Sequence, residues 1–534
     1  MNTRIGITTG LFMIAIASYG QGDYSGDAFR YSEQPISGTA RFQGLGGNHA
    51  ALGGDASNAW GNPAGLGFYN RSEISISPSV RLLNSGANYL GQTTNANKSF
   101  PFVGSASAIF GGRANSREGG RPRRTVWGIT YSRQASLGNN FVAQGQNNRS
   151  SVVDSYIENA NGTTSTNLDR QYDGNVAFPV TYNDGYTVTG LTAAAYQNYL
   201  INANSPPLDS LTYFRFDNRV PVNQRVSFSS TGAVSQWGVS VASNFNDKFY
   251  IGGTLALSHS KYNYTSVISE QYVGGQVFRG MQENTDYQVT GNGINLSVGT
   301  IYKIDQNLQL GLTVQSPTWT TRSYQETTNQ SQTIDPIGIP KLDNNGRPSL
   351  FVPTNKTITV EPQDFDFSVS TPLRLSGGIT YFLGKSGFLT GTVEYVNYAG
   401  MRAGTSYYQD ASDNQAFRQD QTSYIKGIYQ NTVNFRLGGE LRAGIFRARI
   451  GGAYLPSAYK STFDVLARNG DRNTILYSAV LGVRNTKFFA DLAGVYYMTK
   501  TSYTPYYLNN ASDYASALVT NNNTNLTLSV GAFF

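Results

Sequence analysis

Arginines on alternate positions of strand-like segments are the residues best placed to bind a ligand. The guanidinium group presents a planar fork of donors that matches a carboxylate. Alternate residues of a strand share one face, and the same faces carry Glu73, Glu394, Glu440 and Asp491. Two interpretations therefore stay open: the arginines guide the carboxylate of a ligand, or they form ion pairs that stiffen the fold. The candidates for carboxylate guidance are Arg374, Arg436, Arg442, Arg447, Arg449 and Arg484.

The chain offers little for catalysis or metal binding. It has no cysteine, and its only histidines are His49 and His259, so thiolate chemistry and a histidine metal cage are excluded. The Gly44-Leu45-Gly46-Gly47 stretch lacks the Gly-Lys-Ser/Thr ending of a phosphate loop, and Asp343-Asn344-Asn345-Gly346 indicates a plain turn. We expect no enzyme activity, no catalytic residue, no metal and no cofactor. A hydrolase is the weakest alternative, because no Gly-x-Ser-x-Gly elbow is present.

The C-terminal segment shows which elements position these residues. From Thr524 to Phe534, apolar residues alternate with small or polar ones, and the chain ends on Phe534. Such a segment is typical of the closing strand of a transmembrane β-barrel. It also resembles the signal that outer-membrane assembly machinery reads, so this machinery is an expected partner.

Similar alternation recurs along the chain and predicts an all-β fold. We expect an antiparallel transmembrane β-barrel of about fourteen strands, with an uncertainty of about two. It would lie in the outer membrane of a Gram-negative bacterium, in contact with outer-membrane lipids. The expected strands are 73–83, 100–112, 124–135, 234–245, 248–261, 287–304, 307–318, 365–383, 387–401, 428–443, 446–456, 473–484, 487–500 and 523–534.

The connections between these strands alternate between short and long. Short turns such as 384–386 and 444–445 contrast with long loops, of which 136–233 is the longest. This asymmetry is typical of periplasmic turns and extracellular loops. The long loops are polar, and they are candidates for binding protein partners.

The charges predict a positive lumen. Arg81 and Lys303 share the inward phase of the six arginines, and a charge on the lipid side would cost about 2–4 kcal/mol at mid-membrane. The net charge of +7 does not indicate nucleic-acid binding, because no basic helix or aromatic stacking motif accompanies it. The one basic cluster indicates a solvated turn; it contains Arg113, Arg117, Arg121, Arg123 and Arg124.

The N-terminal region divides into two parts before the barrel at 73–534. Residues 1–20 have the charged start, apolar stretch and small-residue end of a signal peptide. Residues 21–72 are rich in Gly and Ala, which allow close backbone packing. We expect this second part to plug the lumen; the alternative is a loose periplasmic tail.

Three motifs in this plug carry a resemblance to a known family. They are Arg41-Phe42-x-Gly44-x-Gly46-Gly47, Gly53-Gly54-Asp55-Ala56-Ser57 and Asn62-Pro63-Ala64-Gly65-Leu66. They resemble the hatch of the FadL/TodX outer-membrane transport family. The resemblance implies a 14-stranded barrel closed by an N-terminal hatch. By this resemblance the hatch or gate residues are Asn62, Pro63, Ala64, Gly46 and Gly47.

The resemblance also implies passive uptake of hydrophobic small molecules such as long-chain fatty acids. The loop 136–233 is longer than a compact transporter needs, which leaves the ligand class open. The alternative is a non-transporting barrel that serves as a subunit of an outer-membrane secretion, assembly or surface complex. Its extracellular loops would then bind the protein partners.

Overall fold

The computed structural model describes residues 24–33, 36–111, 123–181, 186–204, 211–342, 346–354 and 356–534. The predicted signal peptide 1–20, three arginines of the basic cluster (Arg113, Arg117 and Arg121) and positions 343–345 lie outside these ranges. None of the helices within the described ranges is long and apolar enough to cross a membrane.

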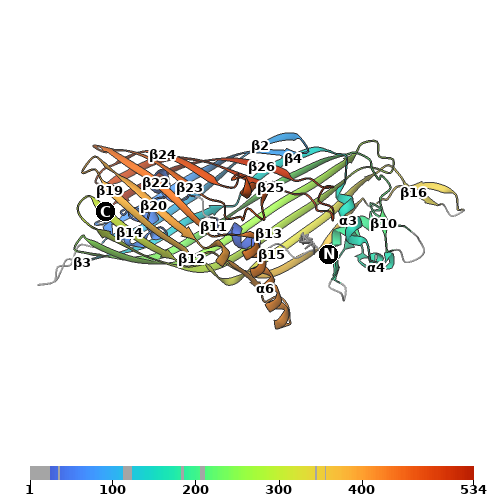
Figure 1. The fold of residues 1–534 in the computed structure, drawn as a ribbon, viewed down its shortest axis with the longest axis horizontal. Coiled ribbons are helices and arrows are strands. Elements are labelled where there is room, and N and C mark those ends of the chain that lie inside the picture. Colours follow the sequence, from blue (N-terminus) through green and yellow to red (C-terminus); the bar gives the residue numbers. More distant parts are fainter. Residues whose placement is uncertain are drawn as a thin grey trace, which may run out of the picture.

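Antiparallel strands close into one barrel (Figure 1). Its last strand returns to its first, where Phe533 lies opposite Glu73. The predicted all-β class and the 14-stranded antiparallel barrel are thereby confirmed. In chain order the wall consists of β1 (Glu73–Tyr89), β2 (Gln92–Gly111), β3 (Arg123–Ser136) with β4 (Asn139–Asn147), β11 (Val222–Phe245), β12 (Phe249–Tyr272), β13 (Phe278–Lys303), β14 (Leu308–Gln315) with β15 (Trp319–Pro336), β18 (Thr357–Ser370) with β19 (Arg374–Phe382), β20 (Gly387–Val396) with β21 (Arg402–Thr405), β22 (Thr432–Ala443), β23 (Phe446–Leu455), β24 (Thr474–Arg484), β25 (Phe488–Tyr503) and β26 (Ala517–Phe533).

The wall is tall on one side and low on the other. β11 and β13 contain 24 and 26 residues, whereas β20 and β23 contain 10 each. The predicted strands 234–245 and 287–304 are therefore too short. The reason is that the outer face becomes polar beyond the lipid belt and the apolar residues lie on the inner face instead, so the outward apolar alternation that reveals a strand is lost there.

Several wall strands are interrupted at neighbouring positions. β14 and β15 are separated at 316–318, β18 and β19 at 371–373, and β20 and β21 at 397–401. Pro317 and Pro372 have no backbone N–H to donate to the ladder. The predictions of unbroken strands over 365–383 and 387–401 are accordingly wrong.

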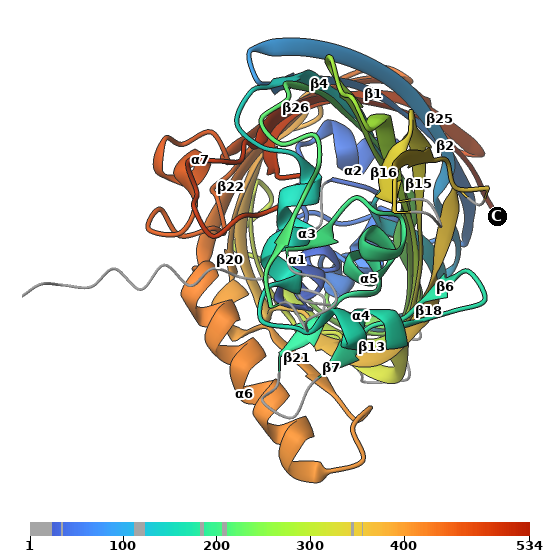
Figure 2. The same cartoon turned by 90° about the vertical axis from the view of Figure 1, so that its right-hand side faces the viewer.

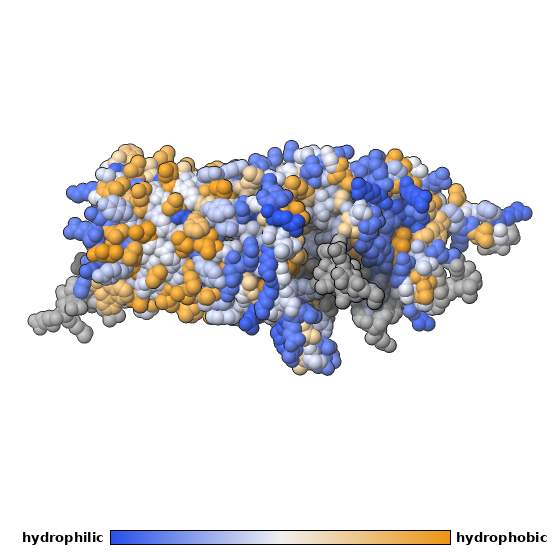
Figure 3. Space-filling view, in the orientation of Figure 1, coloured by the Kyte–Doolittle hydropathy of each residue, from blue (hydrophilic) through white to orange (hydrophobic). Residues whose placement is uncertain are grey.

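Apolar side chains cover the outside of the barrel near its short-turn end (Figure 3). Leu437, Ile450 and Leu481 are each more than 70% exposed. We call this zone the lipid belt, because an outward apolar band is the surface that a membrane barrel presents to hydrocarbon. The long connections lie beyond it, on the extracellular side.

The extracellular end carries a cap and several projections (Figures 1 and 2). The predicted loop 136–233 is shorter than expected, since β4 and the start of β11 belong to the wall. Between them lies the cap, with α3 (Val152–Ala160), α4 (Ser165–Arg170), α5 (Gly190–Gln197) and the short strands β5 (Tyr172–Asp173), β6 (Val176–Ala177), β7 (Val180–Thr181), β8 (Thr187–Val188), β9 (Asn202–Ala203) and β10 (Tyr213–Phe214). The other projections are the hairpin β16 (Ile339–Leu342) and β17 (Pro348–Phe351), and the helices α6 (Ala411–Ile428) and α7 (Val465–Arg468); η3 (Tyr398–Gly400) lies in the break of β20 and β21.

The cap is fixed to the tall side of the wall. Its helix α3 begins at a buried carboxylate of β12: Glu270 accepts hydrogen bonds from the Val152 backbone N–H and from Gln224 Nε2, both at 2.7 Å. The hydroxyl of Tyr156 donates to Glu283 of β13. These buried polar contacts hold the cap over the barrel mouth.

Candidate functional site: the hatch and the lumen above it

The N-terminal segment lies inside the barrel (Figure 2). It consists of α1 (Tyr24–Arg30), α2 (Ala40–Gly44), η1 (Ala56–Ala59) and η2 (Pro63–Phe68). We call residues 36–72 the hatch. The three helices of the hatch, α2, η1 and η2, begin at side-chain caps: Thr39 Oγ1 accepts from Phe42 N at 3.2 Å, and Asp55 Oδ1 accepts from Ser57 N at 2.8 Å. Such caps explain how segments too short to be stable alone keep their shape.

Glycines of the wall bring the hatch backbone against the wall backbone. A Cβ added at Gly311 of β14 would lie 1.7 Å from the Ala50 carbonyl oxygen. A Cβ at Gly299 of β13 would lie 2.0 Å from Asn62 Oδ1, and one at Gly252 of β12 would lie 2.5 Å from the Pro63 carbonyl carbon. No other residue type fits at these contacts, so hatch and wall form a close-packed seam.

Asn62 joins the hatch to itself and to the wall. Its Nδ2 donates to the Ala50 oxygen at 2.6 Å and to the Thr300 oxygen of β13 at 3.1 Å, while its Oδ1 accepts from Ala64 N at 3.1 Å. Pro63 follows as the first residue of η2, where its fixed φ and missing N–H suit a helix start. The predicted hatch residues Asn62, Pro63 and Ala64 thus lie together at this seam, fully or almost fully buried.

Gly46 and Gly47 lie at a second part of the seam. Their φ angles of +67° and +75° fall in the left-handed region that favours glycine. A Cβ at Gly46 would lie 2.6 Å from the Gly452 oxygen of β23, and one at Gly47 would lie 2.8 Å from Arg436 Nη1. Their positions therefore require glycine for two reasons, backbone conformation and space; the gate role stays a prediction.

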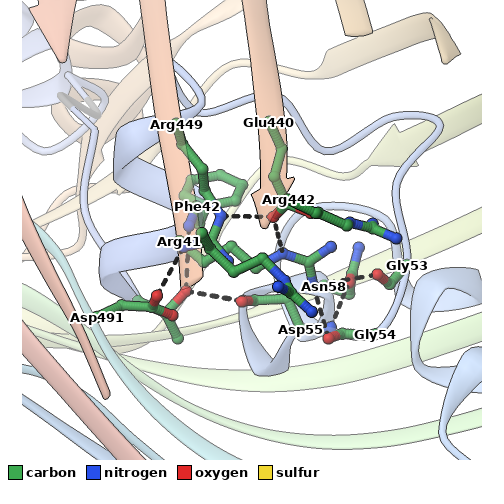
Figure 4. A network of polar contacts seen from close by, with 12 residues as sticks. Arg41, Phe42, Gly53, Gly54, Asp55, Asn58, Glu440, Arg442, Arg449 and Asp491 are labelled. Atoms are coloured by element: carbon green, nitrogen blue, oxygen red, sulfur yellow. Dashed lines mark hydrogen bonds and ion pairs between the residues drawn. The ribbon is translucent and has the colours of Figure 1, made fainter. Parts of the chain in front are cut away.

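A buried network of charges ties the hatch to the low side of the wall (Figure 4). Arg449, whose side chain is 1% exposed, donates to Glu440 at 2.6 Å and to Asp491 at 2.7 Å. Arg442 donates to the other oxygen of Glu440 at 2.6 Å. Arg41 of the hatch lies 4.0 Å from Glu440 and donates to the Gly54 oxygen at 2.7 Å. Arg442 and Arg449 thus take part in ion pairs next to the hatch.

A second cluster, around Glu394, holds more positive than negative charge. Arg374 donates to Glu394 at 3.2 Å and to the Ser32 oxygen at 2.6 Å. Arg436 lies 3.7 Å from Glu394 and donates to the Gly46 oxygen at 3.2 Å. Arg436 Nε is buried and has no hydrogen-bond partner among the described residues. The carboxylate of Glu394 is therefore shared by two guanidinium groups.

This cluster lines a cavity of about 50 Å³ between hatch and wall. Trp60 and Thr313 also line it, and the buried Thr313 hydroxyl has no partner among the residues described. His49 lines it as well, with its Nδ1 3.0 Å from the Gly47 oxygen. Burial lowers the pKa of His49, which favours the neutral imidazole. The cavity can accept a small anionic group.

The remaining candidates lie at the periplasmic end of the barrel. Arg447 donates to the Gly444 and Phe446 oxygens at 2.6 and 2.7 Å. The Arg484 guanidinium lies 4.7 Å from the centroid of the Phe533 ring. The six arginines are thus distributed over three places. Strand phase gives the face of a residue but neither its height nor its partners, so the sequence did not separate these groups.

Aromatic side chains fill the lumen above the hatch, and the sequence analysis missed them. The rings of Tyr24 and Phe29 from α1 stack on Phe365 and Tyr429, with centroid distances of 5.0 and 4.8 Å. We call this set the aromatic chamber; its buried members include Tyr24, Phe29, Tyr31, Tyr262, Tyr287, Tyr324, Phe367, Tyr398, Phe417 and Tyr429. The available signal was a reversed alternation on β12, β15 and β18, with aromatic residues inward and polar residues outward.

The comparisons with known proteins concern the fold. No family model matches the chain, and no curated protein matches it. The solved structure of the toluene transporter TodX from Pseudomonas putida is similar over 94% of this chain and 100% of its own, with 11% identity and a TM-score of 0.50. A FadL homologue from Pseudomonas aeruginosa (11% identity, 93% and 99% coverage, TM-score 0.49) and the toluene transporter TbuX from Ralstonia pickettii (13%, 94% and 99%, 0.48) are also similar.

The closed wall, the lipid belt and the lumenal plug define the class of protein. The chain is a multi-pass β-barrel of a Gram-negative outer membrane, closed by an N-terminal hatch. The likeness to TodX over the whole barrel confirms the FadL/TodX type of fold that the hatch motifs predicted.

Proposed function

We propose that this barrel is a channel for passive uptake of hydrophobic small molecules, with long-chain fatty acids as its substrate class. The aromatic chamber is the observation that carries the proposal. A water-filled porin has a polar lumen, whereas the lumen above this hatch is lined by buried rings. Such a lining favours apolar ligands, because burying an apolar group gains about 25 cal/mol per Å².

The position of α1 supports the same proposal. Tyr24 and Phe29 place their rings among the rings of the wall, as a ligand would. A ligand in the chamber would replace the ring contacts of α1 by apolar contacts of its own, so exchanging α1 for the ligand costs little free energy. The solved structure of TodX is described as that of a toluene transporter, and its cargo is also hydrophobic.

The cluster around Glu394 supports the fatty-acid part of the proposal. Arg374 and Arg436 share one carboxylate, and the cavity beside them has room for a small group. A ligand carboxylate would balance the extra charge and bind as a charge-assisted partner. Arg442 and Arg449 are less suitable for this role, because Glu440 and Asp491 already pair with them.

Uptake of two labelled compounds tests the proposal. Cells that lack their own hydrophobic-compound channels would express the protein, and uptake of palmitate and toluene would be compared with cells carrying an empty vector. We expect uptake of both compounds to rise. Equal uptake in both strains would overturn the proposal, provided that the protein is present and folded in the outer membrane.

The Arg436→Gln variant separates the two parts of the proposal. It removes the charge that the ligand carboxylate would balance, so palmitate uptake should fall while toluene uptake stays. Lys341→Gln, an exposed cation on the hairpin β16–β17, is the matched control. An equal loss of both compounds in Arg436→Gln would point to a damaged hatch rather than to carboxylate binding.

A second candidate function is a subunit of a surface complex. The hairpin β16–β17 projects from the extracellular end (Figure 1), and its Leu342 and Leu350 side chains are 64% and 71% exposed. Exposed apolar side chains on a projecting hairpin favour a protein contact. Purification after mild crosslinking tests this function; a stoichiometric partner that is lost in Leu350→Asn would support it.

A further inference from the structure

Exposed cations border the lipid belt on one side of the barrel. Lys261 lies four residues beyond Leu257 on the outer face of β12, and Arg322 lies three residues beyond Trp319 on β15. Arg402 is exposed at the start of β21, and its backbone lies opposite Ser370 of β18. Lys261 and Arg322 therefore follow strongly exposed apolar residues of the lipid belt on their own strands.

The helix α6 continues this border. It packs on β21 and projects outward from the wall, with a mostly hydrophilic surface (Figures 1 to 3). Phe417 and Ile425 are buried, and the centroid of the Phe417 ring lies 5.5 Å from that of Tyr24 in the aromatic chamber. Arg418 packs its stem against β21, since a Cβ at Gly404 would lie 2.8 Å from Arg418 Cγ. At 3.6 residues per turn, Lys426 lies about 80° around the helix from Arg418, on its solvent side.

The two flanks of α6 differ in charge. Asp413 and Asp420 are seven residues apart and lie on the flank opposite Arg418. Lys460, which follows β23, donates its Nζ hydrogen to the Lys426 oxygen, so it extends the basic flank. We call the following six residues the basic rim: Lys261, Arg322, Arg402, Arg418, Lys426 and Lys460.

The basic rim has no carboxylate partner in the part of the chain that the structure describes. Every ion pair found there involves other cations. On the opposite side the same border is polar or paired: β1 carries Asn84 and Asn88 outward, and Lys500 of β25, which lies opposite Thr520 of β26, pairs with Asp471. The positive charge is therefore a one-sided feature of the border.

We propose that the basic rim binds the phosphate groups of outer-leaflet lipids. The rim borders the lipid belt, so lipids whose acyl chains cover the belt place their head groups at the rim. Arginine and lysine both bind phosphate, arginine through paired donors. Each cation close to an anionic membrane surface strengthens the attraction to it. This site lies outside the barrel and does not depend on what the lumen transports.

Native mass spectrometry of the detergent-solubilised protein tests the proposal. The probes are diphosphoryl lipid A, lipid A without phosphates, and inorganic phosphate. The test variant replaces Lys261, Arg322, Arg402 and Arg418 by Gln. The matched control replaces four exposed cations far from the belt by Gln: Arg170, Arg225, Arg279 and Lys341.

We expect wild type and control to bind diphosphoryl lipid A equally and the test variant to bind it at least about tenfold more weakly. Lipid A without phosphates should bind wild type as weakly as the test variant does. Equal binding of diphosphoryl lipid A to the test variant and to wild type would overturn the proposal. So would equal binding of the two lipids to wild type, or full competition by inorganic phosphate at the lipid's own concentration.

Discussion

The lower lumen, filled by the hatch, and the upper lumen, filled by α1, are closed by different means. At the hatch, backbone lies against backbone at wall glycines such as Gly299 and Gly311, and buried charges join the two parts. Around α1, side-chain rings pack on rings, and the neighbouring wall strands are interrupted. The lower closure is therefore specific to its own residues, whereas the upper closure consists of ring contacts that, under the proposed function, an apolar ligand would replace.

This difference separates two tasks of one barrel. The seam between hatch and wall has no room for an added carbon atom, so it is suited to keep the barrel closed to small solutes. A chamber of rings is suited to exchange one apolar occupant for another. The comparison predicts that substitutions at the glycine seam and the Glu440 network change stability and leakage, and that substitutions in the aromatic chamber change ligand binding.

The largest effect is expected from Glu440→Gln. This change leaves Arg449 buried with one carboxylate and removes the partner of Arg442 and Arg41. Breaking a buried ion pair costs about 3–5 kcal/mol, and urea unfolding in lipid vesicles would measure it. Asp335→Asn is the control, because its pair with Arg279 is exposed and such pairs contribute about 0–1 kcal/mol. Equal losses in both variants would contradict the anchoring role of the network.

A slightly smaller effect is expected from Gly311→Val. The added side chain meets the Ala50 oxygen, and overpacking of this kind costs about 1–3 kcal/mol. We also expect the hatch to seat poorly, which would raise ion conductance in planar bilayers. Gly377→Val is the matched control on the outer face of β19, where a Cβ would lie 3.5 Å from Leu312. Unchanged conductance in Gly311→Val would show that the seam does not seal the lumen.

Asn62→Ala tests a single polar contact of the seam. It removes the donor to the Ala50 and Thr300 oxygens, at a cost of about 1–2 kcal/mol for buried acceptors left unpaired. Hydrogen exchange should then rise in the hatch and stay unchanged in the cap. Asn62→Asp keeps the acceptor for Ala64 N but loses the donors, so it should resemble Asn62→Ala. Full protection in both variants would remove Asn62 from the contacts that hold the hatch.

The smallest effect is a pH dependence of the lower lumen. The pKa of His49 is lowered by burial from an ordinary value of 6.5. As the pH falls, His49 is therefore protonated at a higher pH in the unfolded chain than in the folded protein. Stability is therefore lost as the pH falls below about 6.5. Unfolding of His49→Asn should depend less on pH between 7.5 and 5.5, and His259→Asn, on the outer surface, should behave as wild type. If the free energy of unfolding of His49→Asn depended on pH as steeply as that of the wild type, this assignment would be contradicted.

The sequence predicted the wall well and also predicted that residues 21–72, which include α1, fill the lumen; it did not predict the aromatic chamber. Apolar alternation identified every strand where it crosses the lipid belt, because burial in lipid imposes a period of two. Beyond the belt this constraint ends, so the tall strands β11 to β13 were predicted too short. The hatch motifs named Gly46, Gly47 and Asn62, since glycine and a capping Asn leave a local signature. The inward aromatic residues of β12, β15 and β18 are a local signal, but their packing on α1 is a contact between distant segments, which no local pattern encodes.

A structure of the protein with bound palmitate in a lipid nanodisc tests the central claim most directly. The account predicts ligand density among the rings of Tyr262, Tyr324 and Phe367, with α1 displaced and the hatch seam at Asn62 unchanged. An aromatic chamber still filled by α1, with palmitate only on the outer surface of the barrel, would contradict it.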